Sequence, residues 1–173
     1  MQLIVFSGLP GAGKSSLAEV VGRELGIPVF ASDWLQAALN RSALGEEAEK
    51  RVGFAGYELL TTLAERQFML GQSAILDSVA SIEVVREQWR ALVRKYGVEW
   101  KVIECICSDE TLHRSRLEVR QRHIPGWHEL DWSEVVRVRS YFAPWSEERL
   151  IVDAVRPQQE NVQNTLGYLR QAS

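Results

Sequence analysis

Apolar and polar positions along the chain follow two kinds of pattern in turn. Short apolar runs predict strands, at residues 2–6, 28–31, 73–77, 99–106 and 149–153. Between them, apolar residues recur three or four positions apart and predict helices, at residues 14–25, 33–43, 47–71, 82–96, 109–121, 131–143 and 159–171. Because strands that alternate with helices are joined by crossover connections, we expect an α/β fold built on a mainly parallel sheet.

Residue types at the ends of these segments agree with the predicted boundaries. Gly26 and Pro28 separate the first helix from the second strand, and Gly97 ends the helix before the fourth strand. Asp131 with Glu134 is typical of a capping box at the start of a helix. In parallel sheets of this kind ligands bind outside the carboxyl ends of the strands, so we expect the chemistry in the loops that follow the strands.

Length and composition indicate a single domain over residues 1–173. The chain has 46% apolar and 25% charged residues and a formal net charge of −3, which are ordinary values for a globular protein. A net acidic chain has no overall attraction for a polyanion, so a polynucleotide partner would need a local basic patch. The sequence contains no internal repeat, low-complexity tract or interdomain linker.

Signals of several other protein classes are missing from the sequence. No basic segment opens the chain, and no apolar run approaches about 18 residues. We therefore expect neither a signal peptide nor a membrane span, and a cytoplasmic location. Cys105 and Cys107 predict a buried thiol pair on one strand face rather than a disulfide framework or a zinc cluster. His123 and His128 have no partner at a metal-ligand spacing.

The stretch after the first predicted strand carries the most specific pattern. Residues 8–15 fit G-x-x-x-x-G-K-[ST], a phosphate-binding loop. Its glycines allow successive N–H groups to face one oxyanion, Lys14 brings a cation to the β and γ phosphates, and the Ser15 hydroxyl can ligate Mg²⁺. The alternative is a glycine-rich turn that binds nothing. We expect the nucleotide to be bound by Gly8, Leu9, Pro10, Gly11, Ala12, Gly13, Lys14, Ser15 and Ser16.

Asp33 and Trp34 follow the second predicted strand and are expected beside the phosphates. Asp33 is a candidate catalytic and acceptor-binding residue, because a carboxylate can accept the proton of an attacking hydroxyl. The alternative is that Asp33, next to Ser32, only caps the following helix. Trp34 is a candidate substrate contact because it adjoins Asp33.

Asp77 ends the third predicted strand, at the position of a Walker B acid. Such an acid holds Mg²⁺ directly or through water, and contact with the acceptor is a second possible role. The alternative is a turn residue, since Asp is common after strands. No Glu follows Asp77 to activate water, which favours transfer to an acceptor over hydrolysis.

A basic run at residues 113–123 is the candidate lid of the site. Arg116 and Arg120 are spaced one helical turn apart, and Arg122 lies at the frayed end of the predicted helix. Arginines that arrive with a lid stabilise the charge of a transferring phosphoryl group, so Arg116 and Arg120 are candidate catalytic residues. A Pro-Gly break follows and favours a mobile lid over residues 114–131; the alternative is a solvated helix face.

Four short patterns occur in order along the chain. They are Gly-Leu-Pro-Gly-Ala-Gly-Lys-Ser-Ser-Leu-Ala at the loop, Ser-Asp after the second strand, Ile-Leu-Asp-Ser with Arg86-x-x-Trp89, and Arg116-Leu-x-x-Arg120. This combination resembles the P-loop kinases grouped around the kinase domain of polynucleotide 5′-hydroxyl kinase, often described as AAA-type ATP-binding proteins. Zeta toxins, gluconate kinases and chloramphenicol phosphotransferase are looser relatives.

The resemblance implies a P-loop NTPase three-layer fold with a five-stranded parallel core and a helical lid. It also implies ATP and Mg²⁺ as the donor and phosphorylation of a hydroxyl group. By this likeness Lys14 and Ser15 match donor-phosphate and metal binding. Asp33 matches the acid that activates the acceptor, and Arg120 matches a lid arginine. The chain departs from the polynucleotide kinases at 77–79, where Asp-Ser-Val replaces their Asp-Thr-Asn.

We therefore expect an ATP-dependent phosphotransferase that moves the γ-phosphate to a hydroxyl of a small-molecule or nucleotide-like acceptor. A polynucleotide acceptor is not favoured. The alternative function is a nucleotide-dependent switch or ATPase that acts through a protein partner, although the sequence has no guanine-reading Asn-Lys-x-Asp.

Arg156, after the last strand, is expected beside adenine. Trp34, Trp127, Trp132 and Trp145 lie in regions expected to flank the acceptor cleft; the alternative is that they pack in the core.

Overall fold

Five parallel strands form one sheet in the order β2-β3-β1-β4-β5. The computed structural model describes residues 1–42 and 49–171. The strands are β1 (Gln2–Ser7), β2 (Val29–Ala31), β3 (Ala74–Asp77), β4 (Glu99–Ile106) and β5 (Leu150–Asp153). Each begins and ends within one residue of its predicted range, so the expected five-stranded parallel sheet is confirmed.

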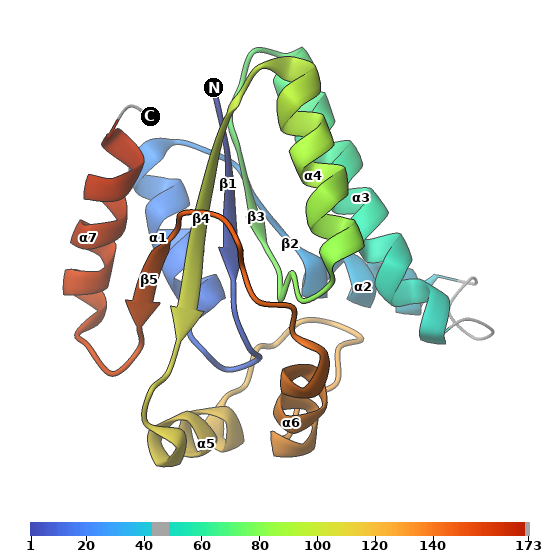
Figure 1. The fold of residues 1–173 in the computed structure, drawn as a ribbon. Helices are drawn as coiled ribbons and strands as arrows, with labels where there is room; N and C mark the ends of the chain where they lie inside the picture. The colour runs from blue at the N-terminus through green and yellow to red at the C-terminus, as the bar shows by residue number, and fades with distance from the viewer. Residues whose placement is uncertain (43–48, 172–173) are drawn as a thin grey trace.

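Helices cover both faces of this sheet (Figure 1). They are α1 (Lys14–Leu25), α2 (Ser32–Arg41), α3 (Glu49–Met69), α4 (Glu83–Tyr96), α5 (Glu110–Val119), α6 (Trp132–Tyr141) and α7 (Gln158–Arg170). In Figure 1, α1 and α7 lie on one face, α3 and α4 lie on the other, and α5 and α6 lie beyond the carboxyl ends of the strands. The predicted start of the third helix at residue 47 falls outside the described residues. Of the described helices, none combines the length and apolar composition needed to cross a membrane.

β1 lies in the middle of the sheet and divides its side chains between two cores. Leu3 and Val5 pack into the cluster under α3 and α4, whereas Ile4 and Phe6 pack into the cluster under α1 and α7. Consecutive side chains of a strand point to opposite faces, so a strand that is covered on both faces is apolar at every position. All four side chains are fully buried, which explains the unbroken apolar run in the sequence.

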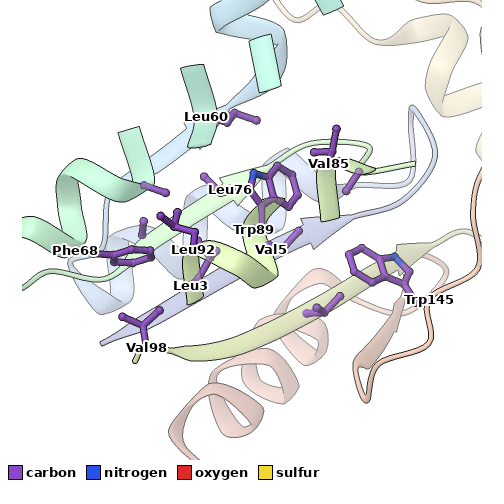
Figure 2. Packing of buried hydrophobic residues seen from close by; sticks show 14 residues of the cluster. Leu3, Val5, Leu60, Phe68, Leu76, Val85, Trp89, Leu92, Val98 and Trp145 are labelled. Atoms are coloured by element: carbon purple, nitrogen blue, oxygen red, sulfur yellow. The ribbon is translucent and has the colours of Figure 1, made fainter. Parts of the chain in front are cut away.

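Trp89 of α4 is the largest fully buried side chain among the described residues and belongs to the first core, which Figure 2 shows from close by. It lies among Leu76 of β3, Leu60 of α3 and Leu92 of its own helix. Its indole Nε1 donates to Thr61 Oγ1 at 3.0 Å. Because the polar N–H has a partner, the ring is buried without an unsatisfied donor, and it joins α3 to α4.

Trp145 belongs to the same core, so the expectation that it flanks the acceptor cleft is wrong. Its side chain is only 6% exposed, and its ring centroid lies 6.5 Å from that of Trp100. Its Nε1 donates to Ser7 Oγ at 3.1 Å. The segment after α6 is thereby attached to the end of β1. Hydrophobic periodicity could not reveal this placement, because Trp145 lies outside the helices and strands.

α5 and α6 each end two residues before the predicted end, α6 at Tyr141. At the end of α5, Arg120 has the extended backbone of a C-cap residue. The spacing of Arg116 and Arg120 predicted that they share a helix face. They do not, because Arg120 lies beyond the end of α5. At the start of α6, the predicted cap is confirmed: the Asp131 carboxylate accepts from two backbone N–H groups, including that of Glu134.

Candidate active site

Three glycines of the loop between β1 and α1 have a positive φ: Gly8, Gly11 and Gly13. Gly8 has a φ of 141°, and a Cβ at this position would lie 2.1 Å from the carbonyl O of Cys105 in β4. Gly13 has a φ of 87°, in the left-handed region, immediately before α1. No side chain caps α1, so the N–H groups of its first turn are left for a bound anion.

This loop forms one wall of a cavity of about 570 Å³ at the carboxyl ends of the strands. The other walls come from α2, β3, the lid and the loop after β5. The predicted site residues that line it are Pro10, Gly11, Ala12, Gly13, Lys14, Ser15, Ser16, Asp33, Trp34, Asp77, Arg116, Arg120 and Arg156. Gly8 and Leu9 instead line a smaller cavity of about 280 Å³. The fold thus gathers most of the predicted residues around one space.

Lys14 and Asp77 are buried side chains of this cavity. Lys14 is 8% exposed, and its Nζ donates to the carbonyl O of Leu9 at 3.0 Å. Burial lowers the pKa of Lys14 to about 8, and the Asp77 carboxylate opposes this effect. Burial likewise raises the pKa of Asp77, opposed by the charge of Lys14. Since burial disfavours both charges, a bound phosphate favours the protonated lysine and a bound cation favours the carboxylate.

Asp33 lies in the first turn of α2 but does not cap it. Ala31 is the N-cap residue, and no side chain makes a cap hydrogen bond to this helix. Instead, Asp33 Oδ2 forms an ion pair with Arg122 Nη1, and Oδ1 accepts from the Ser32 hydroxyl at 3.2 Å. The capping alternative is therefore wrong, and the carboxylate belongs to the cavity lining.

Arg116 and Arg120 reach the cavity at different places. Arg116 Nη1 donates to the carbonyl O of Ala154 at 2.7 Å, beside the loop after β5 where Arg156 also lines the cavity. Arg120 Nε is buried and has no hydrogen-bond partner within the described residues. Burial lowers the pKa of Arg120, opposed by the Glu129 carboxylate. Because an unpartnered buried donor is costly, Arg120 gains most from binding an anion.

Arg122 also lines the cavity, and the sequence predicts no role for it beyond its place in the basic run. Its Nη1 pairs with Asp33, and its Nη2 donates to Ser15 Oγ at 3.2 Å. Helical spacing predicts a pair at Arg116 and Arg120, whereas the position of Arg122 depends on the path of the chain beyond α5. Its membership of the basic run was the one signal available. Further lining residues that were not predicted are Glu19, Ser78, Gln121 and Asn161.

His113 connects the lid to the phosphate loop. Its side chain is 2% exposed, and Nε2 lies 2.7 Å from the carbonyl O of Pro10. A carbonyl oxygen only accepts, so Nε2 carries the proton. Burial lowers the pKa of His113, opposed by the bond to Pro10. The Trp132 ring packs edge-on against the imidazole with centroids 5.2 Å apart, so α5, α6 and the loop pack together.

Of the four tryptophans considered for the acceptor cleft, Trp34 lines the cavity and the other three do not. The Trp34 side chain is 48% exposed. Trp132 packs against His113 instead. Trp127 stacks on His128 with ring centroids 5.3 Å apart. Neither of these two rings is part of the cavity lining, so the expectation that they flank the acceptor cleft is wrong.

Ser15 and Asp77 offer oxygen ligands of the kind that Mg²⁺ prefers. This ion is usually bound by one or two protein groups together with phosphates and waters. Ser15 and Asp77 both line the cavity beside the phosphate loop, and the Ser15 side chain opposes the rise that burial causes in the pKa of Asp77. The donor set therefore fits Mg²⁺ bound with a nucleotide. Over residues 1–42 and 49–171, no three His, Cys, Asp or Glu side chains gather as a metal cluster.

The fold is shared with solved proteins over nearly the whole chain. A candidate kinase from Chloroflexus aurantiacus superposes with a TM-score of 0.76 at 20% identity, covering 99% of this chain and 97% of that one. A gluconokinase from Sinorhizobium meliloti has a TM-score of 0.69 at 16% identity, covering 98% of each chain. An APS kinase from Mycobacterium tuberculosis, solved with AMPPNP and APS, has a TM-score of 0.64 at 20% identity, covering 98% of each chain. At these identities the likeness shows the fold alone. No curated protein matches the chain significantly.

The family follows from a separate comparison. A family model described as an AAA domain matches residues 3–144, which is well over half of the 173 residues. The matched span contains the phosphate loop, Asp33, Asp77, α5 and α6. The narrower likeness to polynucleotide 5′-hydroxyl kinase stays a prediction. The chain belongs to the AAA-domain family of P-loop proteins.

Proposed function

We propose that the chain is an ATP-dependent phosphotransferase that moves the γ-phosphate to a hydroxyl of a small-molecule or nucleotide-like acceptor. The observation that carries this proposal is the position of Asp33, whose carboxylate lines the same cavity as the phosphate loop and does not cap α2. The names of two structural neighbours, a gluconokinase and an APS kinase, support a small-molecule acceptor. The proposed catalytic domain is residues 1–173, with residues 114–131 as its lid.

The donor would bind with its phosphates in the loop at residues 8–16. Lys14 Nζ donates to a backbone carbonyl and Arg120 Nε has no hydrogen-bond partner among the described residues, so both are suited to phosphate oxygens. Arg116 and Arg156 line the end of the cavity near the loop after β5. We assign this end to the adenosine part of ATP.

In the proposed step, the acceptor hydroxyl oxygen forms a bond to the γ-phosphorus while the bond from that phosphorus to the β–γ bridging oxygen breaks. The electron pair of the broken bond stays on the bridging oxygen, which leaves as part of ADP. The hydroxyl proton goes to the Asp33 carboxylate. Lys14 and Arg120 offset the charge that spreads over the transferring group.

Ser15 and Asp77 would hold Mg²⁺ beside the phosphates. When bound, the ion neutralises part of the phosphate charge and orients the β and γ groups. Asp77 is 4% exposed, so its carboxylate is fixed at the end of β3. Because Asp77 lines the cavity, we also assign it contact with an acceptor hydroxyl.

The acceptor would bind beside α2, against the exposed face of Trp34. An aromatic ring at the rim of a polar cavity suits the face of a sugar, a nucleobase or another flat ring. A polynucleotide acceptor is less favoured, because the chain has a net charge of −3 and polynucleotide binding depends on many cationic contacts to phosphate.

The second candidate function is a nucleotide-dependent switch or ATPase that acts through a protein partner. Ser78 follows Asp77, in place of the Glu that activates water in hydrolytic P-loop proteins. The absence of this Glu favours transfer over hydrolysis, with a hydroxyl of the acceptor rather than water as the nucleophile.

The test is a screen of hydroxyl acceptors with γ-labelled ATP and Mg²⁺, covering nucleosides, oligonucleotides, sugars, aminoglycosides and related antibiotics. We expect label in one acceptor class, and loss of this transfer in Lys14→Ala and in Asp33→Asn. Asp33→Asn should still bind Mg-ATP, because the amide preserves the side-chain shape but cannot take the proton. Undiminished transfer by Asp33→Asn would contradict the base role. Release of free phosphate with no labelled acceptor would favour the ATPase.

A further inference from the structure

The Arg122 guanidinium lies between two groups that the proposed reaction needs. Its Nη1 forms an ion pair with Asp33 Oδ2, and its Nη2 donates to Ser15 Oγ at 3.2 Å. The side chains of Arg122 and Asp33 are 10% and 23% exposed, so water screens this contact only partly. One cation therefore engages both the proposed base and the proposed metal ligand.

The lid backbone holds Arg122 in this place. Its own backbone N donates to Glu129 Oε1 at 2.7 Å, across the turn of the lid. Further along, Arg41 Nη1 of α2 donates to the carbonyl O of Pro125. Gly126 lies so close to Arg41 that a Cβ there would be 2.6 Å from Arg41 Cγ. The segment that carries Arg122 is thus tied to α2 and to itself.

This position conflicts with the proposed reaction in two ways. The Arg122 guanidinium lies 3.2 Å from Ser15 Oγ, the atom that would bind Mg²⁺. The positive charges of the guanidinium and of the ion repel each other strongly in a partly buried site. The ion pair also occupies Asp33 Oδ2, an oxygen of the carboxylate that would take the hydroxyl proton. Neither Ser15 nor Asp33 is free for its assigned role while Arg122 stays in place.

We propose that Arg122 is an internal competitor of the Mg-nucleotide complex, which must displace its guanidinium from Ser15 and Asp33 before transfer can occur. The inference rests on the proposed function and adds a regulatory contact to the same site. Arg120, two residues earlier, has the opposite role, since its unpartnered Nε is available to phosphate. The two neighbouring arginines should therefore affect nucleotide binding with opposite signs.

The test compares Arg122→Met, Arg120→Met and Arg114→Met in the full chain by calorimetric titration with AMPPNP in the presence of Mg²⁺. We expect Arg122→Met to bind on the order of tenfold more tightly than the unsubstituted chain, and Arg120→Met to bind more weakly. Arg114 pairs with Glu110 on the same lid helix and does not line the cavity, so Arg114→Met should leave affinity unchanged. Without Mg²⁺, the gain in Arg122→Met should disappear, because no metal then competes for Ser15.

Asp33→Asn supplies a second route to the same contact. It removes the charge that holds Arg122, so it should also tighten Mg-AMPPNP binding, and combining it with Arg122→Met should add little further gain. Equal or weaker binding by Arg122→Met, with the unsubstituted chain still binding, would overturn the competitor and leave the proposed function standing. If neither the unsubstituted chain nor any of these variants binds Mg-AMPPNP, both proposals fail.

Discussion

The Arg86 guanidinium lies flat against the core rather than in solvent, with Cζ 3.7 Å from the ring centroid of Trp145. Arg86 is fully buried. Its Nε donates to the carbonyl O of Ala80 at 2.7 Å, and its two terminal nitrogens donate to Pro144 at 2.9 Å and Ala143 at 2.7 Å. One side chain thus joins the segment after β3 to the segment that leaves the lid.

Replacing Arg86 should therefore cost more stability than replacing an exposed arginine. Arg86→Met leaves three backbone carbonyl groups without this donor, in one buried contact (Ala80) and two part-buried ones (Ala143 and Pro144), and we expect a loss of about 3 kcal/mol in the free energy of unfolding. Urea denaturation measures it. The matched control is Arg94→Met on the same helix, where a half-exposed ion pair with Glu87 predicts a change within about 0.5 kcal/mol. Equal effects of the two substitutions would show that the buried contacts of Arg86 add nothing.

The framework of the fold could be predicted because its signals are local. An unbroken apolar run such as 3–6 requires a strand covered on both faces, and 3.6-residue periodicity marks the helices between strands. The phosphate loop, Asp33 and Asp77 could be predicted for the same reason, because each follows a strand whose carboxyl end meets the same edge of the sheet.

The rest of the site depends on the path of irregular segments, which no local pattern encodes. Arg122 reaches Asp33 because α5 ends two residues early and the chain turns back through the lid. Trp145 is buried because Arg86 and Ser7, distant in the sequence, hold it in place. Residue type could not decide between core packing and a site role for the tryptophans: Trp145 joins the core, and Trp127 and Trp132 lie outside the cavity lining.

Gly8 should tolerate no side chain. In Gly8→Ala, a methyl group would lie 2.1 Å from the backbone carbonyl O of Cys105, and no side-chain rotation relieves a clash with backbone. We expect a loss of at least about 2 kcal/mol in unfolding free energy, together with weaker AMPPNP binding. Thermal unfolding and calorimetry measure the two effects.

The control for Gly8 is Gly167→Ala within α7, where a Cβ would meet nothing within 4 Å. Alanine favours helix over glycine, so this variant should gain up to about 1 kcal/mol and bind AMPPNP normally. Destabilisation of both variants would indicate that the added methyl group, rather than the close approach to Cys105, is responsible.

Trp34 should affect the acceptor and not the donor. Its half-exposed ring lines the cavity beside Asp33, so Trp34→Ala removes contact area from the acceptor in its ground and transition states alike. We expect the KM for the acceptor to rise about tenfold with kcat little changed, while the KM for ATP is unaffected. Trp34→Phe should recover part of the loss, because it restores an aromatic face. A rise in the KM for ATP would place Trp34 on the donor side instead.

The titration of Lys14 should make nucleotide binding weaker as the pH rises above about 8. The Lys14 pKa of about 8 in the free chain results from burial, and a bound triphosphate favours the protonated amine, so binding raises that pKa. Protons are therefore taken up when nucleotide binds near pH 8, by about half a proton per chain at that pH. Above pH 8 an increasing share of Lys14 is neutral before binding, and affinity should fall by about tenfold between pH 7 and pH 9.

Calorimetry of AMPPNP binding at pH 8, in two buffers of different ionisation enthalpy, measures this uptake directly. Lys14→Arg is the matched variant, because a guanidinium keeps the positive charge and does not titrate in this range. It should bind with no proton uptake and with a flat dependence on pH between 7 and 9, even if its affinity is lower. Proton uptake that persists in Lys14→Arg would assign the titration to another group, and its absence in the unsubstituted chain would mean that Lys14 is already fully protonated without a ligand.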